Sequence, residues 1–160
     1  MMQVMTASDR SNAEVYREHA AELVRYATVL VGPTDAADVV ADAVLGAFGS
    51  RVWPTVTNRR AYLYRAVYHR ALDLRRGAAR RHRREAVTAS SDSVVGAEPS
   101  LDAQRALHHL PAQQRAVVYL TYWADLTPAQ AAELLDVSEG TVRKQLARAR
   151  TTLRRVLDAD

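Results

Sequence analysis

Residues 127 to 150, TPAQAAELLDVSEGTVRKQLARAR, constrain the fold more than any other segment, because they predict two short helices separated by a tight turn. Thr127 and Gln130 have the spacing of a capping box at the start of the first helix. Asp136 falls where the chain must turn, and aspartate tolerates the left-handed backbone conformation better than most residues. Ser138 is a second N-cap, so the next helix is expected to begin directly after it.

The second of these helices has an apolar side and a basic side. Apolar residues recur at helical spacing on one side, namely Val142, Leu146, Ala149 and Leu153. Arg143, Lys144 and Arg148 fall on other sides. An apolar stripe opposite Arg and Lys is typical of the recognition helix of a helix-turn-helix, which lies in the major groove of DNA. The other interpretation is a solvated basic helix that ends a bundle, and the two caps with the short turn favour the helix-turn-helix.

The rest of the chain also has the apolar periodicity of helices. This pattern predicts a helix over residues 11–31, ended by Gly32-Pro33, a second from Asp35 to about Phe48, and a third from about Asn58 to beyond Arg76. Two more helices are expected after residue 100, on either side of a break at Leu110-Pro111. The sequence therefore predicts an all-α fold.

Residues 85–100, EAVTASSDSVVGAEPS, differ in kind, because serine, glycine and proline with weak periodicity mark a linker. We therefore expect two small helical domains, 11–84 and 101–160, joined by a flexible linker and preceded by a disordered arm over residues 1–10. The sequence has no cysteine, no signal-peptide pattern at its start and no apolar run near the roughly 20 residues of a membrane span. These features favour a cytoplasmic protein.

Charge is separated along the first domain. Residues 14–42 carry six acidic residues against two arginines, whereas residues 59–84 carry ten arginines against Asp73 alone. Such patches suggest a basic partner for the first segment and a polyanion for the second. Asp38 and Asp42 lie one helical turn apart, and no histidine or third carboxylate is spaced to make a metal or acid–base site with them. A docking surface and a plain solvated face remain the interpretations of this pair, and we expect no metal, cofactor or enzymatic activity.

Aromatic residues accompany the arginines, which is a combination suited to single-stranded nucleic acid, because bases stack on exposed rings. The alternative is that most of these rings belong to the core. We expect Phe48 and Tyr62 in the core, and we expect Trp53 and either Tyr64 or Tyr68 to be exposed.

Three segments in order resemble the extracytoplasmic-function (ECF) class of sigma factors in the sigma-70 family. Residues 35–44, DAADVVADAV, are similar to the family's helix that docks on the clamp helices of RNA polymerase. Residues 60–76, RAYLYRAVYHRALDLRR, are similar to the family's third helix, and residues 107–150 resemble its promoter-distal reading domain almost element for element. The resemblance covers roughly residues 14–84 and 101–157.

The resemblance implies a sigma factor that joins core RNA polymerase and promoter DNA, with an anti-sigma factor as a further candidate partner. It implies core-polymerase contacts by Asp35, Asp38 and Asp42. For minus-ten DNA the candidates lie in the loop 51–58 and the helix after it, namely Trp53, Thr55, Asn58, Tyr64, Tyr68, Arg75 and Arg76. For minus-thirty-five DNA they are Ser138, Thr141, Arg143, Lys144 and Arg148, of which we expect Arg143 and Lys144 to read bases and Arg148 to anchor the backbone. The alternative is a stand-alone helix-turn-helix regulator, with residues 1–84 as a sensor or dimerisation domain.

Overall fold

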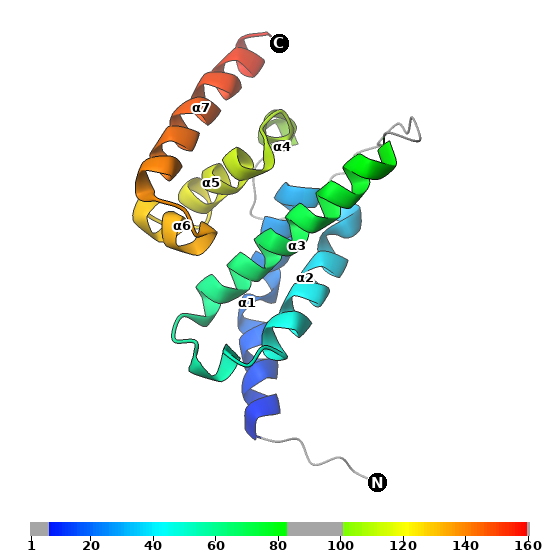
Figure 1. Ribbon diagram of the computed structural model, residues 1–160. Helices are drawn as coiled ribbons and strands as arrows, with labels where there is room; N and C mark the ends of the chain where they lie inside the picture. Colours follow the sequence, from blue (N-terminus) through cyan, green and yellow to red (C-terminus); the bar gives the residue numbers. More distant parts are fainter. Residues whose placement is uncertain (1–6, 83–100, 160) are drawn as a thin grey trace.

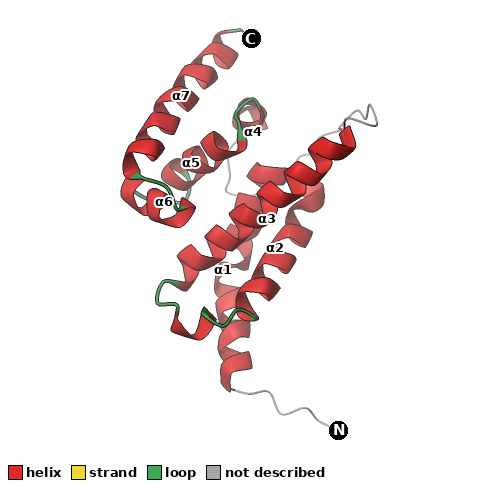
Figure 2. Ribbon diagram, in the orientation of Figure 1, coloured by secondary structure: helices red, strands yellow, loops and turns green. Residues whose placement is uncertain are grey.

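A computed structural model describes residues 7–82 and 101–159, and all regular structure in these ranges is helical (Figure 1, Figure 2). The elements, in chain order, are α1 (Ala7–Val31), α2 (Pro33–Phe48), the short 3₁₀ helix η1 (Trp53–Thr55), α3 (Arg59–His82), α4 (Leu101–His108), α5 (Ala112–Tyr122), α6 (Pro128–Leu135) and α7 (Glu139–Asp158). The expected all-α fold class is confirmed.

The helices α1, α2 and α3 pack against one another and form the first unit, blue to green in Figure 1. The turn between α1 and α2 requires Gly32, whose φ of 89° lies in the left-handed region. Pro33 then starts α2, where its missing N–H has no helical partner to lose. The helix α1 begins at Ala7, one turn before the expected start, and the rest of the arm expected over residues 1–10 lies outside the described residues.

The helices α4 to α7 form the second unit, and the caps that the sequence predicts at the start of α6 and α7 are confirmed. The Thr127 hydroxyl accepts from the Gln130 N–H, and the Gln130 side chain accepts from the Thr127 N–H, at 3.2 and 2.9 Å. Asp136 ends α6 with a φ of 57°, in the left-handed region. The Ser138 hydroxyl then caps α7 by accepting from the Thr141 N–H. The helix-turn-helix is therefore built largely from local interactions.

The two units pack against each other. The rings of Tyr26 in α1 and Tyr119 in α5 have centroids 5.4 Å apart, and buried residues of both units form one continuous cluster. Arg115 of α5 is only 4% exposed, and it donates to the carbonyl oxygens of Val29 and Leu30 at the end of α1, at 3.1 and 3.2 Å. Burial lowers the pKa of the Arg115 guanidinium to about 10, so it stays charged at neutral pH. The linker expected over residues 85–100 lies outside the described residues.

Candidate partner-binding and nucleic-acid interfaces

The acidic residues expected to dock a basic partner lie on the solvent side of α2. Asp35, Asp38 and Asp42 are all exposed. The structure adds a neighbour that the sequence did not indicate, because Asp42 Oδ2 accepts a hydrogen bond from Arg70 Nη2 of α3 at 3.0 Å. An exposed ion pair contributes only about 0–1 kcal/mol to stability, so a partner can displace it at low cost.

An apolar groove lies beside these carboxylates, between α1 and α2. Its volume is about 330 Å³, and its lining residues are Ala13, Tyr16, Ala41, Val44, Leu45 and Phe48. Leu45 is 70% exposed and Tyr16 is 40% exposed. Contiguous apolar surface is typical of a protein–protein contact. The sequence analysis missed this groove, although Ala41 and Leu45 fall one turn apart and outside the buried stripe of α2, which is the signal that could have found it.

Trp53, in the loop between α2 and α3, lies inside the protein. Its side chain is 3% exposed, and its indole N–H donates to Asn12 Oδ1 at 2.8 Å. The Arg59 guanidinium lies 4.9 Å from the Trp53 ring centroid, a cation–π contact. The prediction that Trp53 is exposed is wrong, because a partner from α1 satisfies its one polar atom and Phe48 packs against its ring at 5.0 Å.

Tyr64 and Tyr68 are also buried, at 1% and 6% exposure, whereas one of them was expected on the surface. A ring with no exposed face is not available to a base, so neither tyrosine is a stacking platform in this arrangement of the chain. Phe48 and Tyr62, which were expected in the core, are half-buried and pack against it.

The remaining candidates for minus-ten DNA differ in exposure and in the hydrogen bonds that their side chains make within the protein. Thr55 and Asn58 in the loop are exposed, and so is Arg76 of α3. The Asn58 side chain also caps α3 by accepting from the backbone N–H three residues later, at 3.1 Å. Arg75 is half-buried and donates to the Leu30 carbonyl oxygen at the end of α1, at 3.1 Å. Arg75 therefore has a structural contact that the sequence did not indicate.

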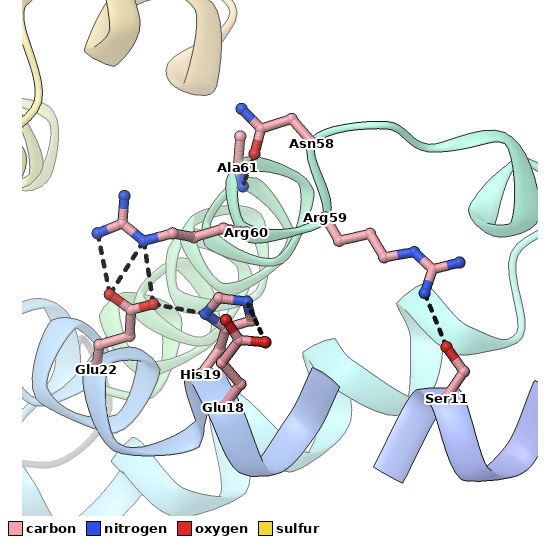
Figure 3. Close-up of polar contacts among 8 residues, drawn as sticks. All are labelled: Ser11, Glu18, His19, Glu22, Asn58, Arg59, Arg60 and Ala61. Carbon is pink, nitrogen blue, oxygen red and sulfur yellow. Dashed lines mark hydrogen bonds and ion pairs between the residues drawn. The ribbon is translucent and has the colours of Figure 1, made fainter. Parts of the chain in front are cut away.

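One carboxylate of α1 connects this helix to the start of α3 (Figure 3). Glu22 accepts hydrogen bonds from Arg60 Nη2 at 3.0 Å and from the Tyr64 hydroxyl at 2.9 Å, and it lies 2.8 Å from the His19 ring. Burial raises the pKa of Glu22, but the hydrogen bonds from Arg60, His19 and Tyr64 together lower it more, so its pKa lies below the ordinary 4.5. Burial and the nearby Glu22 charge raise the pKa of Tyr64, which keeps its hydroxyl protonated as a donor. This network holds the Tyr64 ring inward.

The recognition helix α7 presents its basic residues to solvent. Arg143, Lys144 and Arg148 are exposed, while Val142, Leu146 and Ala149 are buried, as the apolar stripe predicts. Arg143 Nη2 donates to Glu139 Oε1 at 2.7 Å, one turn back on the same helix. The predicted contact residues Ser138 and Thr141 lie in the first turn, where the Ser138 hydroxyl already serves as the cap. The three basic residues therefore lie on the solvent side of α7, and their contact with a duplex remains a prediction.

The start of α3 faces the helix-turn-helix. A small cavity of about 120 Å³ lies between them and is lined by Asn58, Arg60, Ala61 and Tyr64 on one side and by Leu126, Gln130, Glu133 and Leu134 on the other. Arg65 of α3 donates to the carbonyl oxygens of Glu133 and Leu134 at the end of α6, the latter at 3.1 Å. The second unit thus partly covers a surface that was predicted to contact minus-ten DNA.

Within residues 7–82 and 101–159, no group of three or more histidine, cysteine, aspartate or glutamate side chains is arranged to hold a metal ion. The helices in these ranges also include none with the length and apolar character to cross a membrane. The features described above are candidate contact surfaces: an acidic and apolar face on α2, a loop whose Trp53 bonds to α1, and a capped helix-turn-helix with a basic exterior. Together with the all-helical fold, they define a two-unit DNA-binding protein of the helix-turn-helix class.

Comparison with known proteins gives the family. Residues 100–153 match the family model described as sigma-70, region 4. The chain is 35% identical to the ECF RNA polymerase sigma factor SigM of Mycobacterium tuberculosis, over 90% of this chain and 76% of that protein. It is 34% identical to SigL of the same organism, over 89% of this chain and 86% of that protein. It is 30% identical to the RNA polymerase sigma-E factor of Streptomyces avermitilis, over 91% and 84%.

Two solved structures share the fold. The sigma factor RpoE of Bartonella quintana, in complex with the anti-sigma factor NepR, has a TM-score of 0.76 at 22% identity, and covers 92% of this chain and 97% of that one. CnrH in complex with the cytosolic domain of CnrY has a TM-score of 0.68 at 25% identity, over 94% and 90%. The chain belongs to the ECF RNA polymerase sigma factors. Its function is that of a sigma factor in promoter-specific transcription initiation, and this membership favours that interpretation over a stand-alone regulator.

Proposed function

We propose that this chain divides the work of a sigma factor between its two units. The first, residues 11–84, holds core RNA polymerase and the minus-ten element. The second, residues 101–160, reads the minus-thirty-five element, and residues 85–100 link the two. The proposal is supported by the presence, on one chain of this family, of a capped helix-turn-helix and a separate acidic and apolar face. This role requires no catalytic residue and no cofactor, and we expect it in the cytoplasm, where RNA polymerase works.

Core polymerase docks on α2 through two kinds of contact. Asp35, Asp38 and Asp42 supply negative charge for a basic surface. The adjoining groove accepts an apolar side chain beside the exposed Leu45. Apolar contact at the centre of an interface supplies much of the affinity, while charges at its rim guide association and orientation. Leu45 therefore joins the three aspartates as a proposed docking residue.

The exposed loop residues carry direct contact with minus-ten DNA. Thr55 and Asn58 present polar side chains, and Arg76 presents a cation on α3. Trp53, Tyr64 and Tyr68 are buried, so they are proposed to act on this surface through packing and not through direct contact with DNA. Stacking of bases on those three rings would need the rings to leave their buried positions.

The helix α7 carries contact with minus-thirty-five DNA. Arg143 and Lys144 lie near the start of the helix, where base edges are usually met, and Arg148 lies one turn further on. We assign base reading to the first two and backbone anchoring to Arg148. The two solved relatives are sigma factors in complex with anti-sigma factors, so an anti-sigma factor is a further candidate partner of this chain.

The test is co-migration of the purified protein with core RNA polymerase in size-exclusion chromatography. The wild-type protein is expected to co-migrate. Asp38→Arg and Leu45→Glu are each expected to weaken binding about tenfold or more, because each places an unpaired charge in the interface. Both residues are exposed, so helicity and the melting temperature are expected to change little.

Two exposed residues of α7 provide matched controls. Asp158→Arg makes the same charge change as the aspartate variant, and Leu157→Glu makes the same change as the leucine variant, both far along the chain from α2. These controls are expected to bind like the wild type. Failure of the wild type to co-migrate would count against the sigma-factor role itself. Wild-type binding by both α2 variants would show that another surface docks the polymerase.

A further inference from the structure

The loop between α2 and α3, residues 49–58, has little regular structure of its own, since η1 is a single short turn. What holds it is a set of contacts with the first turns of α1. Asn12 Oδ1 accepts from Trp53 Nε1 at 2.8 Å, and Ser11 Oγ accepts from Arg59 Nη1 at 3.1 Å. The second contact is drawn in Figure 3. These bonds join residues 41 and 48 positions apart in the chain.

The four side chains form a closed circuit. Asn12 and Ser11 are neighbours on α1, Trp53 and Arg59 stand at the middle of the loop and just after its end, and the Arg59 guanidinium lies over the Trp53 ring at 4.9 Å. A substitution at any one of these four residues is therefore expected to alter the positions of the other three side chains. The ring of Trp53 also packs against Phe48 from the end of α2, with centroids 5.0 Å apart.

The polar bond to Asn12 selects one orientation of the indole. Apolar packing alone tolerates several rotations of a flat ring, but a buried N–H that lacks an acceptor is strongly disfavoured. The orientation with the Trp53 N–H directed at Asn12 is therefore preferred. Because Trp53 lies in the middle of the loop, the orientation of its side chain fixes the backbone that carries Thr55 and Asn58 on the outside.

We propose that Asn12, supported by Ser11, is a positioning residue for minus-ten recognition: it sets the conformation of the loop 49–58 through Trp53 and Arg59, without contacting DNA itself. This inference rests on the proposed function, in which the loop contacts minus-ten DNA. It gives α1 a part in promoter choice that is separate from its packing role, and it gives the buried Trp53 an indirect role.

The test is transcription by the reconstituted holoenzyme from a promoter library randomised at both the minus-ten and the minus-thirty-five elements. Asn12→Ala leaves the indole N–H without its acceptor. We expect it to lower about tenfold, equivalent to ~1.4 kcal/mol, the ratio of transcription from the preferred minus-ten sequence to transcription from other minus-ten sequences. The corresponding ratio for the minus-thirty-five element is expected to stay unchanged. Asn12→Asp retains an acceptor oxygen and is expected to restore most of the preference. Ser11→Ala is expected to have a smaller effect in the same direction.

The proposed route through Trp53 is tested by Trp53→Phe, which keeps an aromatic ring and removes the N–H donor. This variant is expected to reduce minus-ten preference, and the double variant with Asn12→Ala is expected to be no worse than the more impaired single variant. Additive losses would show that Asn12 does not act through the indole.

A general loss of stability is separated from positioning by Val24→Ala, which removes a partly buried side chain of α1 away from the loop. It is expected to lower the melting temperature and to leave the preference at both elements intact. The inference is overturned if Asn12→Ala lowers only the melting temperature, or if it alters both elements alike. If the wild-type protein supports no promoter-dependent transcription, the proposed function fails, and that outcome is distinct from either of these.

Discussion

At the scale of single residues, two of the buried rings, Tyr64 and Trp53, find partners for their polar atoms on α1. The Tyr64 hydroxyl finds Glu22, and the Trp53 indole finds Asn12, both on α1. A buried polar group without a partner costs about 1–3 kcal/mol, so each of these bonds favours one orientation of its ring. The orientations of the Tyr64 and Trp53 rings therefore depend on α1.

Glu22→Gln is expected to lower the free energy of unfolding by about 1–3 kcal/mol at neutral pH, because it removes charged hydrogen bonds from Arg60 and the Tyr64 hydroxyl. The pKa of Glu22 in the folded protein lies below its ordinary 4.5. Its stabilisation is therefore complete above about that pH and is lost as the pH falls through the folded pKa. We expect chemical denaturation at pH values from 7 to 3 to show that the free energies of unfolding of the variant and the wild type approach each other below pH 4.5.

The control for this prediction is Asp42→Asn, which breaks an exposed ion pair with Arg70 and is expected to cost only about 0–1 kcal/mol. A difference between Glu22→Gln and the wild type that stays constant across the whole pH range would contradict the assignment of the charge on Glu22 as the stabilising feature.

At the scale of helices, local patterns predicted the second unit better than the first. The capping box at Thr127, the left-handed Asp136 and the Ser138 cap depend on residues no more than a few positions apart, and all three are confirmed. Exposure of Trp53 was predicted wrongly, because its partner Asn12 is 41 residues away and no local pattern indicates it. A sequence pattern reports neighbours along the chain, whereas burial of a loop residue depends on which helix lies beneath it.

The groove beside α2 shows the same difference between features that depend on neighbours along the chain and features that depend on the packing of distant segments. The exposed positions of Asp38 and Asp42 follow from the helical period and are seen in the structure. The groove itself combines Tyr16 of α1 with Leu45 of α2, so it exists only once the two helices pack. The acidic half of this surface could be predicted from sequence, and the apolar half required the fold.

For the recognition helix, Lys144→Ala is expected to relax base preference at minus-thirty-five positions by about 1–3 kcal/mol and to leave minus-ten preference intact. Arg148→Ala is expected to weaken binding to all sequences alike, as loss of a phosphate contact does. Transcription from a library randomised at both elements measures the two effects separately. Altered minus-ten preference in the Lys144 variant, or no change at either element, would exclude α7 from the reading role.

At the scale of the whole molecule, side chains bridge the two units at several points. Arg115 joins α5 to the end of α1, Arg65 joins α3 to the end of α6, and the rings of Tyr26 and Tyr119 meet between them. Both arginines donate to backbone carbonyl oxygens in the last turn of a helix, where the carbonyl groups are not all satisfied by the helix itself. The units therefore form one closed body in which the helix-turn-helix rests against the start of α3.

Arg65→Ala is expected to loosen this closed arrangement, because the carbonyl oxygens at the end of α6 lose a charged donor. Small-angle X-ray scattering of the protein alone is expected to show a larger radius of gyration than for the wild type. Arg70→Ala is the matched control, since it removes the same charge from α3, where the Arg70 side chain bonds Asp42 inside the first unit. Identical scattering from both variants would contradict a role of Arg65 in closure.

If the start of α3 contacts minus-ten DNA as proposed, the cover that α6 places over it makes the affinity for DNA depend on the equilibrium between closed molecules and molecules with separated units. Only the fraction of molecules with separated units offers that surface fully, so the affinity measured for the protein alone equals the intrinsic affinity multiplied by that fraction. A closed-to-open ratio of 99 to 1, for example, lowers it about 100-fold. A polymerase that binds only the separated form raises the affinity for promoter DNA by this factor. Promoter DNA then raises the affinity for polymerase by the same factor, because such coupling is reciprocal.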